Sequence, residues 1–391
     1  MRLVQEAKEL IKDNIRDYGM YIALIVIMIT FTILTDGLFM SSRNISNLLD
    51  SAGYIAVLAV GVMLVIVIRH IDLSIGFLAG FLGAIAAILL MKVGMPVYLV
   101  IPIILFLGIL AGLGTGVLVA KVGIPSFVAT LAGWLIYRGA ILLVTEETGT
   151  IIVQNDAFNA IGNGYIPSLM EVGGLHLLSL LLGGVGILLY IYSAISNRRN
   201  KIRYQFEVVS KEIFILQLLF VSAIIAYITW ILAGYNGFSW TVVIMLLVVL
   251  IYHFFTNKTV LGRHIYAVGS NPEAAHLSGI NVNKITFLVF GSMGLLSALS
   301  GILFTARLQS ATTTAGTLFE LDAIAAAYVG GVSAAGGVGK VTGAIIGAIV
   351  MASLTNGMNL LGVGIAPQYI IRGGVLAIAV IFDVMTRKQR A

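Results

Sequence analysis

The stretch that decides the fold is residues 213–257, IFILQLLFVSAIIAYITWILAGYNGFSWTVVIMLLVVLIYHFFTN, which contains no Asp, Glu, Lys or Arg. Uncharged apolar runs beyond about 18 residues are candidates for transmembrane helices, and this run is long enough for two, expected at 213–233 and 239–256. Two further runs, 285–306 and 341–371, are also uncharged. The chain is therefore predicted to be an integral membrane protein.

The overall composition points the same way. Of 391 residues, 59% are hydrophobic and 10% are charged, against about 25% charged in ordinary soluble domains. The absence of cysteine excludes disulfides, a thiol nucleophile and an iron–sulfur site. The mixed-charge segment 1–19 precedes an apolar run at 21–34 without a small-residue cleavage site, so we expect an uncleaved first span rather than a removed signal peptide.

The basic residues predict the topology. Lys and Arg gather in four segments, which by the positive-inside rule are cytoplasmic together with both termini: 1–17, 197–211, 257–284 and RKQR at 387–390. Residues 145–173 and 308–320 carry mainly Glu and Asp, as outside loops do. Nucleic-acid binding, the other interpretation of the net charge of +6, is not expected because the positive charges lie near span ends.

Twelve membrane spans are expected within a single transmembrane domain, 1–391. Their approximate bounds are 20–35, 53–69, 73–91, 97–120, 126–145, 174–195, 213–233, 239–256, 285–306, 321–337, 341–362 and 368–384. RHIDLS (69–74) interrupts the second and third, and the four glycines of 321–337 favour a half-helix or re-entrant segment. The predicted fold class is an all-α polytopic membrane protein with about 10–12 transmembrane helices, some broken or re-entrant.

Two glycine ladders predict close helix packing. Gly108, Gly112 and Gly116 form one, and Gly339, Gly343 and Gly347 form the other. A spacing of four places the glycines on one helix face, where two backbones can approach closely. The alternative is that one ladder lines a narrow conduit. Ladders in both halves of the chain also hint at an internal repeat, which is common in transporters.

The sequence gives little support for catalysis. AAGGVGKVTG (334–343) lacks the first glycine of a phosphate loop and has Val341 where a Ser or Thr would hold magnesium. GLGTG (112–116) lies inside a span, and the five histidines lack the paired spacing of a zinc site. An intramembrane protease would have only Asp72 and Asp322 as a carboxylate pair, outside any hydrolytic motif. No catalytic residue, metal or cofactor is expected.

A few polar side chains remain inside the spans: Arg69, His70, Asp72, Arg138 and Asp322, with Glu320 and Arg372 nearer the ends. Such groups usually pair or face a pathway. RHIDLS is expected to be a helix break in which Asp72 caps the next helix, with a gate or solute contact as the alternative. Arg138 is expected to be paired or snorkelling rather than bound to solute. Asn356 and Asn359 could equally bind a polyol or tie two helices together.

A polar loop, AVGSNPEAAHLSGINVNK (267–284), lies between these apolar spans. Ser270 or Asn271 can cap a helix, Pro272 suits a first helical position, and Gly279 can end the helix in the left-handed conformation. The loop is therefore predicted to contain a rigid helix of about two turns.

Residues Glu273 to Gly279 match the E-A-A-x-x-x-G loop of binding-protein-dependent transport permeases. LGRHIYAVGSNPEAAHLSGINV (261–282) resembles this loop in the sugar branch of that family, which includes ribose, galactoside and xylose permeases. Four more blocks resemble the same branch, and the likeness covers about residues 20 to 386: LFMSSRNISNLL (38–49), IDLSIG (71–76), IPSFVATLAGWLIYRG (124–139) and ELDAIAAAYVGGVSAAGGVGKVTGAIIGA (320–348).

The resemblance implies a permease that performs no ATP chemistry itself. Two copies would form the path, a separate cytoplasmic ATPase would grip each copy through the coupling loop 267–284, and an external binding protein would deliver the sugar. The implied coupling residues are Asn271, Pro272, Glu273, Ala274, Ala275, Leu277, Gly279 and Ile280. Ala274 and Ala275 would present a low-profile surface to the ATPase. Residues 174–235, an extra pair of spans relative to ribose and galactoside permeases, are similar to xylose-type permeases and make xylose or a related simple sugar the expected solute.

A path for a neutral sugar needs hydrogen-bonding groups rather than net charge. The polar groups that the sequence offers are Asp72, Ser74, Asp322 and Asn356. The broken segments 69–76 and 320–337 are expected to face the central cavity of a dimer, and 174–235 to lie on its periphery among lipid. The alternative is a secondary transporter driven by an ion gradient, in which Asp72 or Asp322 would cycle its charge but the coupling loop would have no use.

Overall fold

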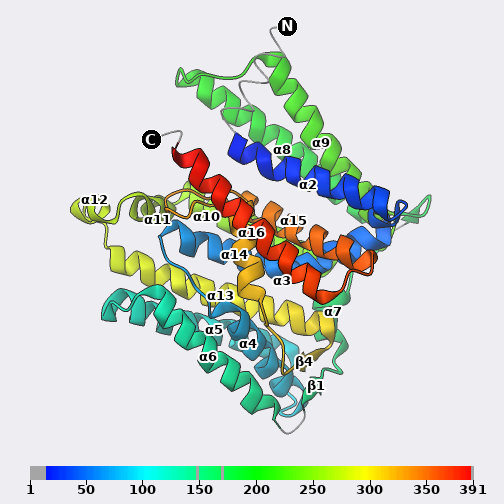
Figure 1. The fold of residues 1–391 in the computed structure, drawn as a ribbon. Helices are drawn as coiled ribbons and strands as arrows, with labels where there is room; N and C mark the ends of the chain where they lie inside the picture. The colour runs from blue at the N-terminus through cyan, green and yellow to red at the C-terminus, as the bar shows by residue number, and fades with distance from the viewer. Residues whose placement is uncertain (1–14, 147–148, 169–170, 389–391) are drawn as a thin grey trace.

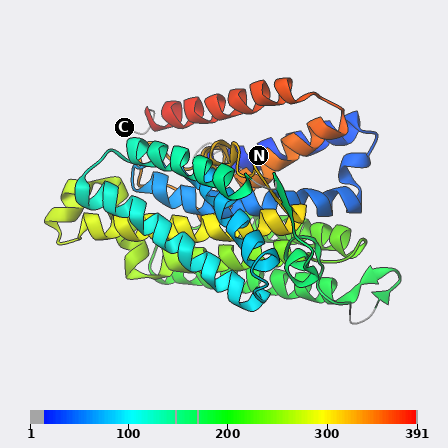
Figure 2. The ribbon, with the colours of Figure 1, turned by 90° about the horizontal axis from the view of Figure 1, so that it is seen from below.

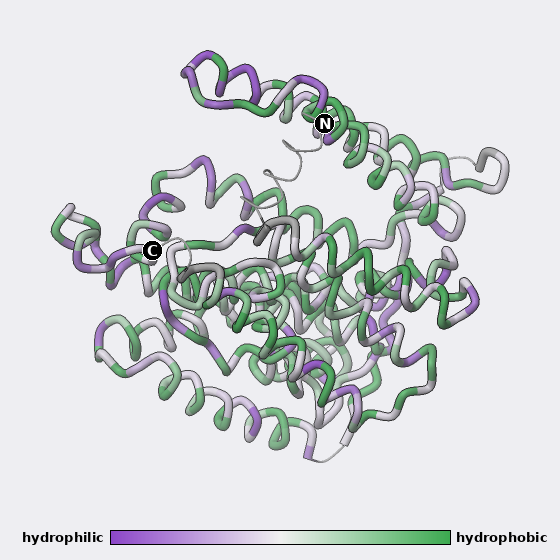
Figure 3. The backbone as a smooth tube through the Cα atoms, turned by 45° about the horizontal axis from the view of Figure 1, so that its top comes forward, coloured by the Kyte–Doolittle hydropathy of each residue, from purple (hydrophilic) through white to green (hydrophobic). Residues whose placement is uncertain are grey.

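The chain folds as a helical bundle with two distinct ends. The computed structural model describes residues 15–146, 149–168 and 171–388. The long helices run in one general direction, with α11 (Val260–Ser270) and α12 (Pro272–Leu277) at one end and the paired strands β1 (Thr150–Ile152) and β4 (Ser310–Thr312) at the other (Figures 1 and 2). We call these the α12 end and the strand end. Figure 3 shows apolar residues along the helices and polar residues gathered in the loops.

The remaining elements complete a multi-pass arrangement. They are α2 (Ile15–Leu34), η1 (Leu38–Met40), α3 (Ser42–Val67), α4 (Ile75–Met91), α5 (Val97–Val117), the π-helical η2 (Leu118–Val122), α6 (Ser126–Thr145), α7 (Asp156–Asn163), β2 (Glu171–Val172), β3 (Leu175–His176), α8 (Leu177–Arg203), α9 (Lys211–Ala233), α10 (Trp240–Lys258), α13 (Val282–Leu308), α14 (Phe319–Val329), α15 (Val341–Leu360) and α16 (Ile365–Lys388). Within the described residues, nine helices are long and apolar enough to cross a membrane. The predicted all-α polytopic membrane fold is confirmed.

Most expected spans hold to within a few residues. α6 has the predicted bounds. α3 begins well before the expected residue 53, because the Ser41 side chain caps it by accepting a hydrogen bond from the backbone N of Asn44. α8 continues past the expected residue 195 to Arg203. The helices α7 and α11 were not expected.

Both irregular segments are present. α3 ends at Val67 and α4 begins at Ile75, so residues 68–74 form a non-helical break. α14 has only 11 residues, and the chain is irregular on both sides of it apart from β4. At about 1.5 Å per residue, α14 spans roughly half of a bilayer core. The sequence left two alternatives for segment 321–337, a half-helix and a re-entrant segment. The structure has the half-helix.

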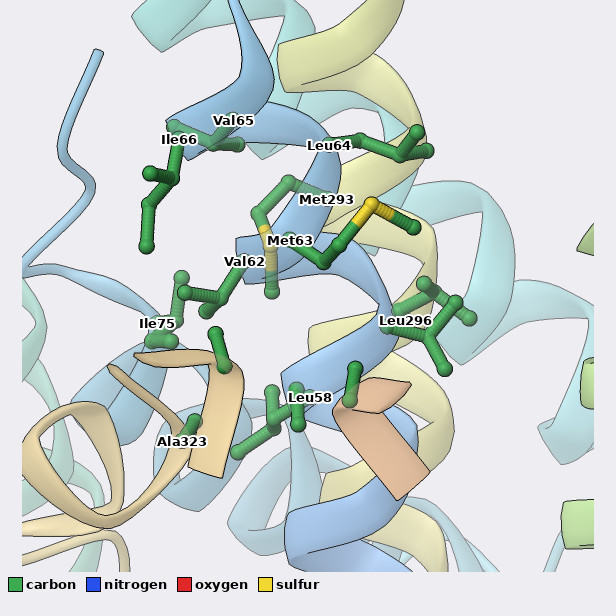
Figure 4. Close-up of a cluster of buried hydrophobic side chains, with 14 of the residues drawn as sticks. Leu58, Val62, Met63, Leu64, Val65, Ile66, Ile75, Met293, Leu296 and Ala323 are labelled. Atoms are coloured by element: carbon green, nitrogen blue, oxygen red, sulfur yellow. The ribbon is translucent and has the colours of Figure 1, made fainter. Parts of the chain in front are cut away.

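The hydrophobic core is built around α3. In the most apolar 18 residues of α3, 89% of the residues are buried. In the corresponding part of α16, only 6% are buried. Figure 4 shows side chains of α3 meeting residues from three other helices: Leu58, Val62 and Met63 lie near Met293 and Leu296 of α13, Ile75 of α4 and Ala323 of α14. Because α3 contacts helices from both halves of the chain, it fixes the positions of both irregular segments.

The glycine ladders pack helices together, as predicted, except that Gly339 lies in the loop before α15 and not on the helix. Gly112 of α5 lies against the backbone of Phe290 and Gly294 in α13, and Gly347 of α15 lies against the carbonyl of Ala326 in α14. In both places a side chain would collide with a neighbouring backbone. The missing side chains therefore set the spacing between these helices.

We expect Gly112→Ala to lower the melting temperature of the purified chain, and Gly114→Ala on the same helix to leave it unchanged or higher. A Cβ at Gly112 would overlap the carbonyl oxygen of Phe290, whereas nothing lies within 4 Å of a Cβ at Gly114. Overpacking of this kind costs about 1–3 kcal/mol. Thermal unfolding in detergent measures the difference, and equal melting temperatures for the two variants would contradict the packing argument.

Candidate functional site

The two irregular segments lie side by side inside the bundle. Gly76 at the start of α4 packs so closely on Gly316 and Glu320 that a Cβ would overlap both, and Gly80 lies in the same way against Ala315. The irregular backbone before α14 is thus covered by α4, as non-helical backbone at membrane depth requires.

The two segments have opposite order. The first is irregular toward the α12 end, at 68–74, and continues as α4. The second is irregular toward the strand end, at 309–318, where β4 pairs with β1, and continues as α14 toward the α12 end. The backbone N–H of Gly337, in the loop after α14, donates to the carbonyl of Val67 at 2.8 Å. This bond joins the end of the second segment to the beginning of the first.

Asp72 and Ser74 are joined by two hydrogen bonds in a buried turn. Asp72 is 6% exposed and Ser74 is 1% exposed. The Asp72 Oδ1 accepts hydrogen bonds from the backbone N of Ser74 at 2.9 Å and from its Oγ at 2.6 Å. Ser74 occupies the N-cap position of α4, which lacks a side-chain cap bond. The prediction that Asp72 caps α4 is therefore wrong: its carboxylate shapes the turn before the helix instead.

Glu320 holds a second buried carboxylate next to this turn. It is 4% exposed, and the Trp134 Nε1 donates to its Oε1 at 3.0 Å. Its Oε2 has no hydrogen-bond partner among the described residues and lies where a Cβ of Gly76 would be. The carboxylate thus sits at the N-terminus of α4, where the helix dipole favours negative charge.

A polar cavity lies between α3, α14, α15 and α16. Two of the four predicted path residues, Asp322 and Asn356, line it, together with the polar side chains of Ser51, Tyr54, Thr355, Asn359 and Arg372. Arg372 Nη1 lies 3.2 Å from Asp322 Oδ2, so the two charges offset each other. The cavity therefore offers hydroxyl and amide groups together with an ion pair that carries no net charge. The other two predicted path residues, Asp72 and Ser74, do not line this cavity and lie in the buried turn described above.

Asn356 and Asn359 both line this cavity and both tie helices together. Asn44 at the start of α3 donates from Nδ2 to Asn356 Oδ1 at 2.9 Å, and Asn356 Nδ2 donates back to Asn44 Oδ1 at 3.1 Å. Gln368 of α16 donates to Asn359 Oδ1 at 2.8 Å. These bonds fix the cavity wall through α15, so both residues tie helices together, and binding of a polyol by them stays a prediction.

Arg138 of α6 supports the irregular stretch before α14. Its Nη1 donates to the carbonyl of Thr313 at 2.5 Å, and its guanidinium carbon lies 5.0 Å from the centre of the Phe77 ring. The guanidinium is thus paired, as expected, but with a backbone carbonyl and an aromatic ring rather than a carboxylate.

The short helix of the coupling loop is capped as the sequence predicts. Asn271 Oδ1 accepts from the backbone N of Ala274 at 3.0 Å, and Pro272 occupies the first position. Gly279 has a φ of +83°, in the left-handed region that ends a helix. α12 is thus a rigid turn-and-a-half of helix that projects from the α12 end (Figure 1).

The exposed face of α12 differs from the expected one. Ala275 is 4% exposed and packs into the hydrophobic core, so it cannot form part of a surface for a partner. Leu277 is 87% exposed, which is unusual for a large apolar side chain. Glu273, Ala274 and His276 are exposed beside it. The outer face is therefore a Leu tip with polar neighbours rather than a pair of alanines.

Arg69 joins the first break to the base of α12. Its Nε donates to the carbonyl of Gly269 at 2.7 Å, and its Nη2 donates to the carbonyl of Ser270, directly before the helix. Arg69 itself has a φ of +65°, which is costly for a residue with a Cβ. Tyr266 of α11 donates to the carbonyl of Gly339, at 2.7 Å. α11 therefore holds both irregular segments at their α12 ends.

Comparison with known families is consistent with this architecture. The family model described as branched-chain amino acid transport system / permease component matches residues 44–380. The chain belongs to this permease family. The members of such a family are the membrane components of transport systems.

Three relatives illustrate how similar the permease is to characterised members. It is 40% identical over 378 residues to the xylose transport system permease protein XylH of Haemophilus influenzae, covering 96% of this chain and 98% of the relative. It is 38% identical over 376 residues to XylH of Escherichia coli K12, covering 96% and 93%. It is 34% identical over 292 residues to the ribose import permease protein RbsC of Haemophilus influenzae, covering 74% and 69%. No solved structure matches the permease.

Proposed function

We propose that the chain is the membrane-spanning subunit of an ATP-driven importer of xylose or a related simple sugar. Two of the relatives are xylose permeases that align along nearly their whole length. The cavity lined by Asp322 and Asn356 supports a polar, uncharged solute, because it offers hydrogen-bonding groups and a neutralised ion pair. The observation that carries the proposal is the capped helix α12, with Leu277 exposed at its tip and Arg69 at its base.

The proposed partners fit different surfaces. A cytoplasmic ATPase would bind α12, where an exposed Leu can act as an interface anchor. A second copy of the permease would complete the path beside the cavity, where the apolar part of α16 is only 6% buried and remains for a protein or lipid neighbour. An external sugar-binding protein would bind the strand end.

The proposal assigns the α12 end and both termini to the cytoplasm. Basic residues near span ends support this orientation, among them Arg198, Lys258 and Lys284. Of the basic groups used to predict it, those in residues 1–14 and Arg390 lie outside the described residues.

Single cysteines test this orientation against a clean background, because the chain has no cysteine. A cysteine at Asn200 or Ser278 is expected to react with a membrane-impermeant maleimide only from the cytoplasmic side, and one at Asp156 only from outside. Labelling at Asn200 from outside would contradict the twelve-crossing topology, including the extra pair of spans at 174–235.

The energy source separates the proposal from its alternative. Uptake of labelled xylose by cells that express the complete transport system is expected to survive a proton uncoupler and to stop when ATP is depleted. An ion-driven carrier would show the reverse. If uptake followed the ion gradient and persisted without the ATPase, the proposal would fail.

Gly279→Val is expected to leave the permease in the membrane and to reduce coupled uptake several-fold. Gly279 has a φ of +83°, a conformation that costs an L-residue about 1–2 kcal/mol and a β-branched one more, so the end of α12 must shift. Nothing lies within 4 Å of a Cβ there, so the effect is due to the backbone. Gly279→Asn is the control, since Asn tolerates this conformation. Equal uptake by both variants would count against the role of the helix exit.

A further inference from the structure

The hairpin of α8 and α9 has a feature that sugar transport does not explain. Near the strand end it joins the bundle through Ile231 and Leu232 of α9, which pack on Ile45 of α3. Gly183 of α8 meets Thr229 of α9 so closely that a Cβ would overlap it. The other end of the hairpin carries a basic loop and lies at the edge of the bundle (Figure 1).

An open cavity lies at this end, between the two helices. One part of its lining is polar and the other part is apolar. The polar side chains are Asn197, Arg198, Lys201, Glu207 and Gln217, and the apolar part comprises Tyr190, Ala194, Val208, Val209, Phe214 and Leu218.

The polar part lies at the depth of lipid headgroups. α8 has 27 residues, so at about 1.5 Å per residue it is roughly 40 Å long, against about 30 Å for the hydrocarbon core. Its last two turns, which include Arg198 and Lys201, therefore extend into the headgroup layer. Ala194 and Tyr190, about one and two turns before Arg198, lie beside the acyl chains. The polarity of the cavity changes where that of the membrane changes.

Arg198 is held in place before any ligand arrives. Its Nη1 donates to the carbonyl of Val209 at 2.8 Å, and its guanidinium carbon lies 4.7 Å from the centre of the Phe214 ring. A guanidinium has five N–H groups, so these contacts fix its plane and leave donors for further oxygens. A fixed guanidinium loses little entropy when it binds a phosphate.

We propose that this cavity binds the headgroup of an anionic phospholipid with one phosphate, of the phosphatidylglycerol type. The phosphodiester would lie between Arg198 and Lys201, and the acyl chains would follow the apolar lining. The charges of Arg198, Lys201 and Glu207 sum to +1. The cavity therefore complements a lipid with one net negative charge better than it complements a zwitterionic lipid. The Glu207 carboxylate can accept a hydrogen bond from a headgroup hydroxyl. The extra spans would thus fasten the permease to the lipid around it.

Native mass spectrometry of the purified full-length permease tests the proposal with phosphatidylglycerol, phosphatidylethanolamine and phosphatidylcholine of identical acyl chains. We expect phosphatidylglycerol to be retained preferentially. In the variant R198A/K201A its affinity should fall about 30-fold, because two basic contacts with the lipid are lost. The matched control is R199A/R203A, which removes two charges from the same helix end but from outside the cavity lining. The control should retain at least half of the bound lipid.

Several outcomes would overturn the proposal. Equal losses in the two double variants would mean that only bulk charge attracts the lipid. Equal retention of the three lipids by the wild type, or stronger retention of phosphatidylethanolamine, would exclude the proposed headgroup. Displacement by inorganic phosphate would show that the ligand is a free phosphate and not a lipid. If R198A/K201A fails to fold, K201A alone is used, with an expected loss of about fivefold.

Discussion

Arg69→Asn is expected to leave the permease folded and in the membrane, but to lower sugar uptake by the complete transporter at least tenfold. The substitution removes two charge-assisted hydrogen bonds to the carbonyls of Gly269 and Ser270, each worth about 1.5–3 kcal/mol when buried and less here, where they are partly exposed. Asn tolerates the left-handed backbone of residue 69, so no new strain is added. Uptake should fall because movement of α12 no longer reaches the first break.

The measurement compares uptake with ATP hydrolysis by the assembled complex. We expect hydrolysis to continue in Arg69→Asn while uptake falls, which is the pattern of uncoupling. Arg69→Lys should be intermediate, since an ammonium cannot span two carbonyls as a guanidinium does. Arg263→Asn is the control for lost charge, because Arg263 is exposed on the neighbouring α11. Normal uptake in Arg69→Asn would refute the link between α12 and the break.

The second large effect is expected at the ion pair beside the cavity. Arg372→Met should destabilise the permease because it leaves the carboxylate of Asp322 without its partner. Breaking a buried pair costs about 3–5 kcal/mol. The side chains here are 21% and 23% exposed, so the lower end of that range applies. Thermal unfolding in detergent and the amount of folded protein in the membrane both report the loss.

The double variant Asp322→Asn with Arg372→Met should recover most of this stability, because it removes both charges. The interaction energy from this double-mutant cycle would then be a large part of the loss of stability caused by Arg372→Met alone. If the double variant were as unstable as Arg372→Met, packing rather than charge would account for the loss. Normal stability of Arg372→Met would show that water already screens Asp322.

The sequence predicted those features whose signals are local. The expected limits of the α6 span, 126–145, were right, and in the structure Pro125 directly precedes this helix and Glu146 directly follows it. The caps of α12 were right because Asn271, Pro272 and Gly279 each have a strong positional preference. The half-helix at 321–337 was recognised because four glycines follow a short apolar run. In each case a few neighbouring residues determine the backbone.

The features that sequence reasoning missed depend on distant partners. Arg69 binds backbone carbonyls 200 residues away, and a carbonyl leaves no trace in the residue type. Asn44 was not singled out because its partner, Asn356, is 312 residues away. Ala275 was assigned to the wrong face because α12 is too short for periodicity to show which side packs inward. Tertiary contacts, not local propensity, decide these positions.

The opposite order of the two breaks has a consequence for how such a path could open. The irregular stretch at 68–74 is fastened to the end of α11, directly before α12, where the ATPase is proposed to bind. The irregular stretch at 309–318 is fastened to β1 through β4, at the surface proposed for the binding protein. Under the proposal, each mouth of the path would have its own irregular wall beside a different partner, while a helix, α4 or α14, continues the same segment toward the opposite mouth. One mouth would then be able to widen without the other, and an occluded intermediate with both mouths shut would be allowed.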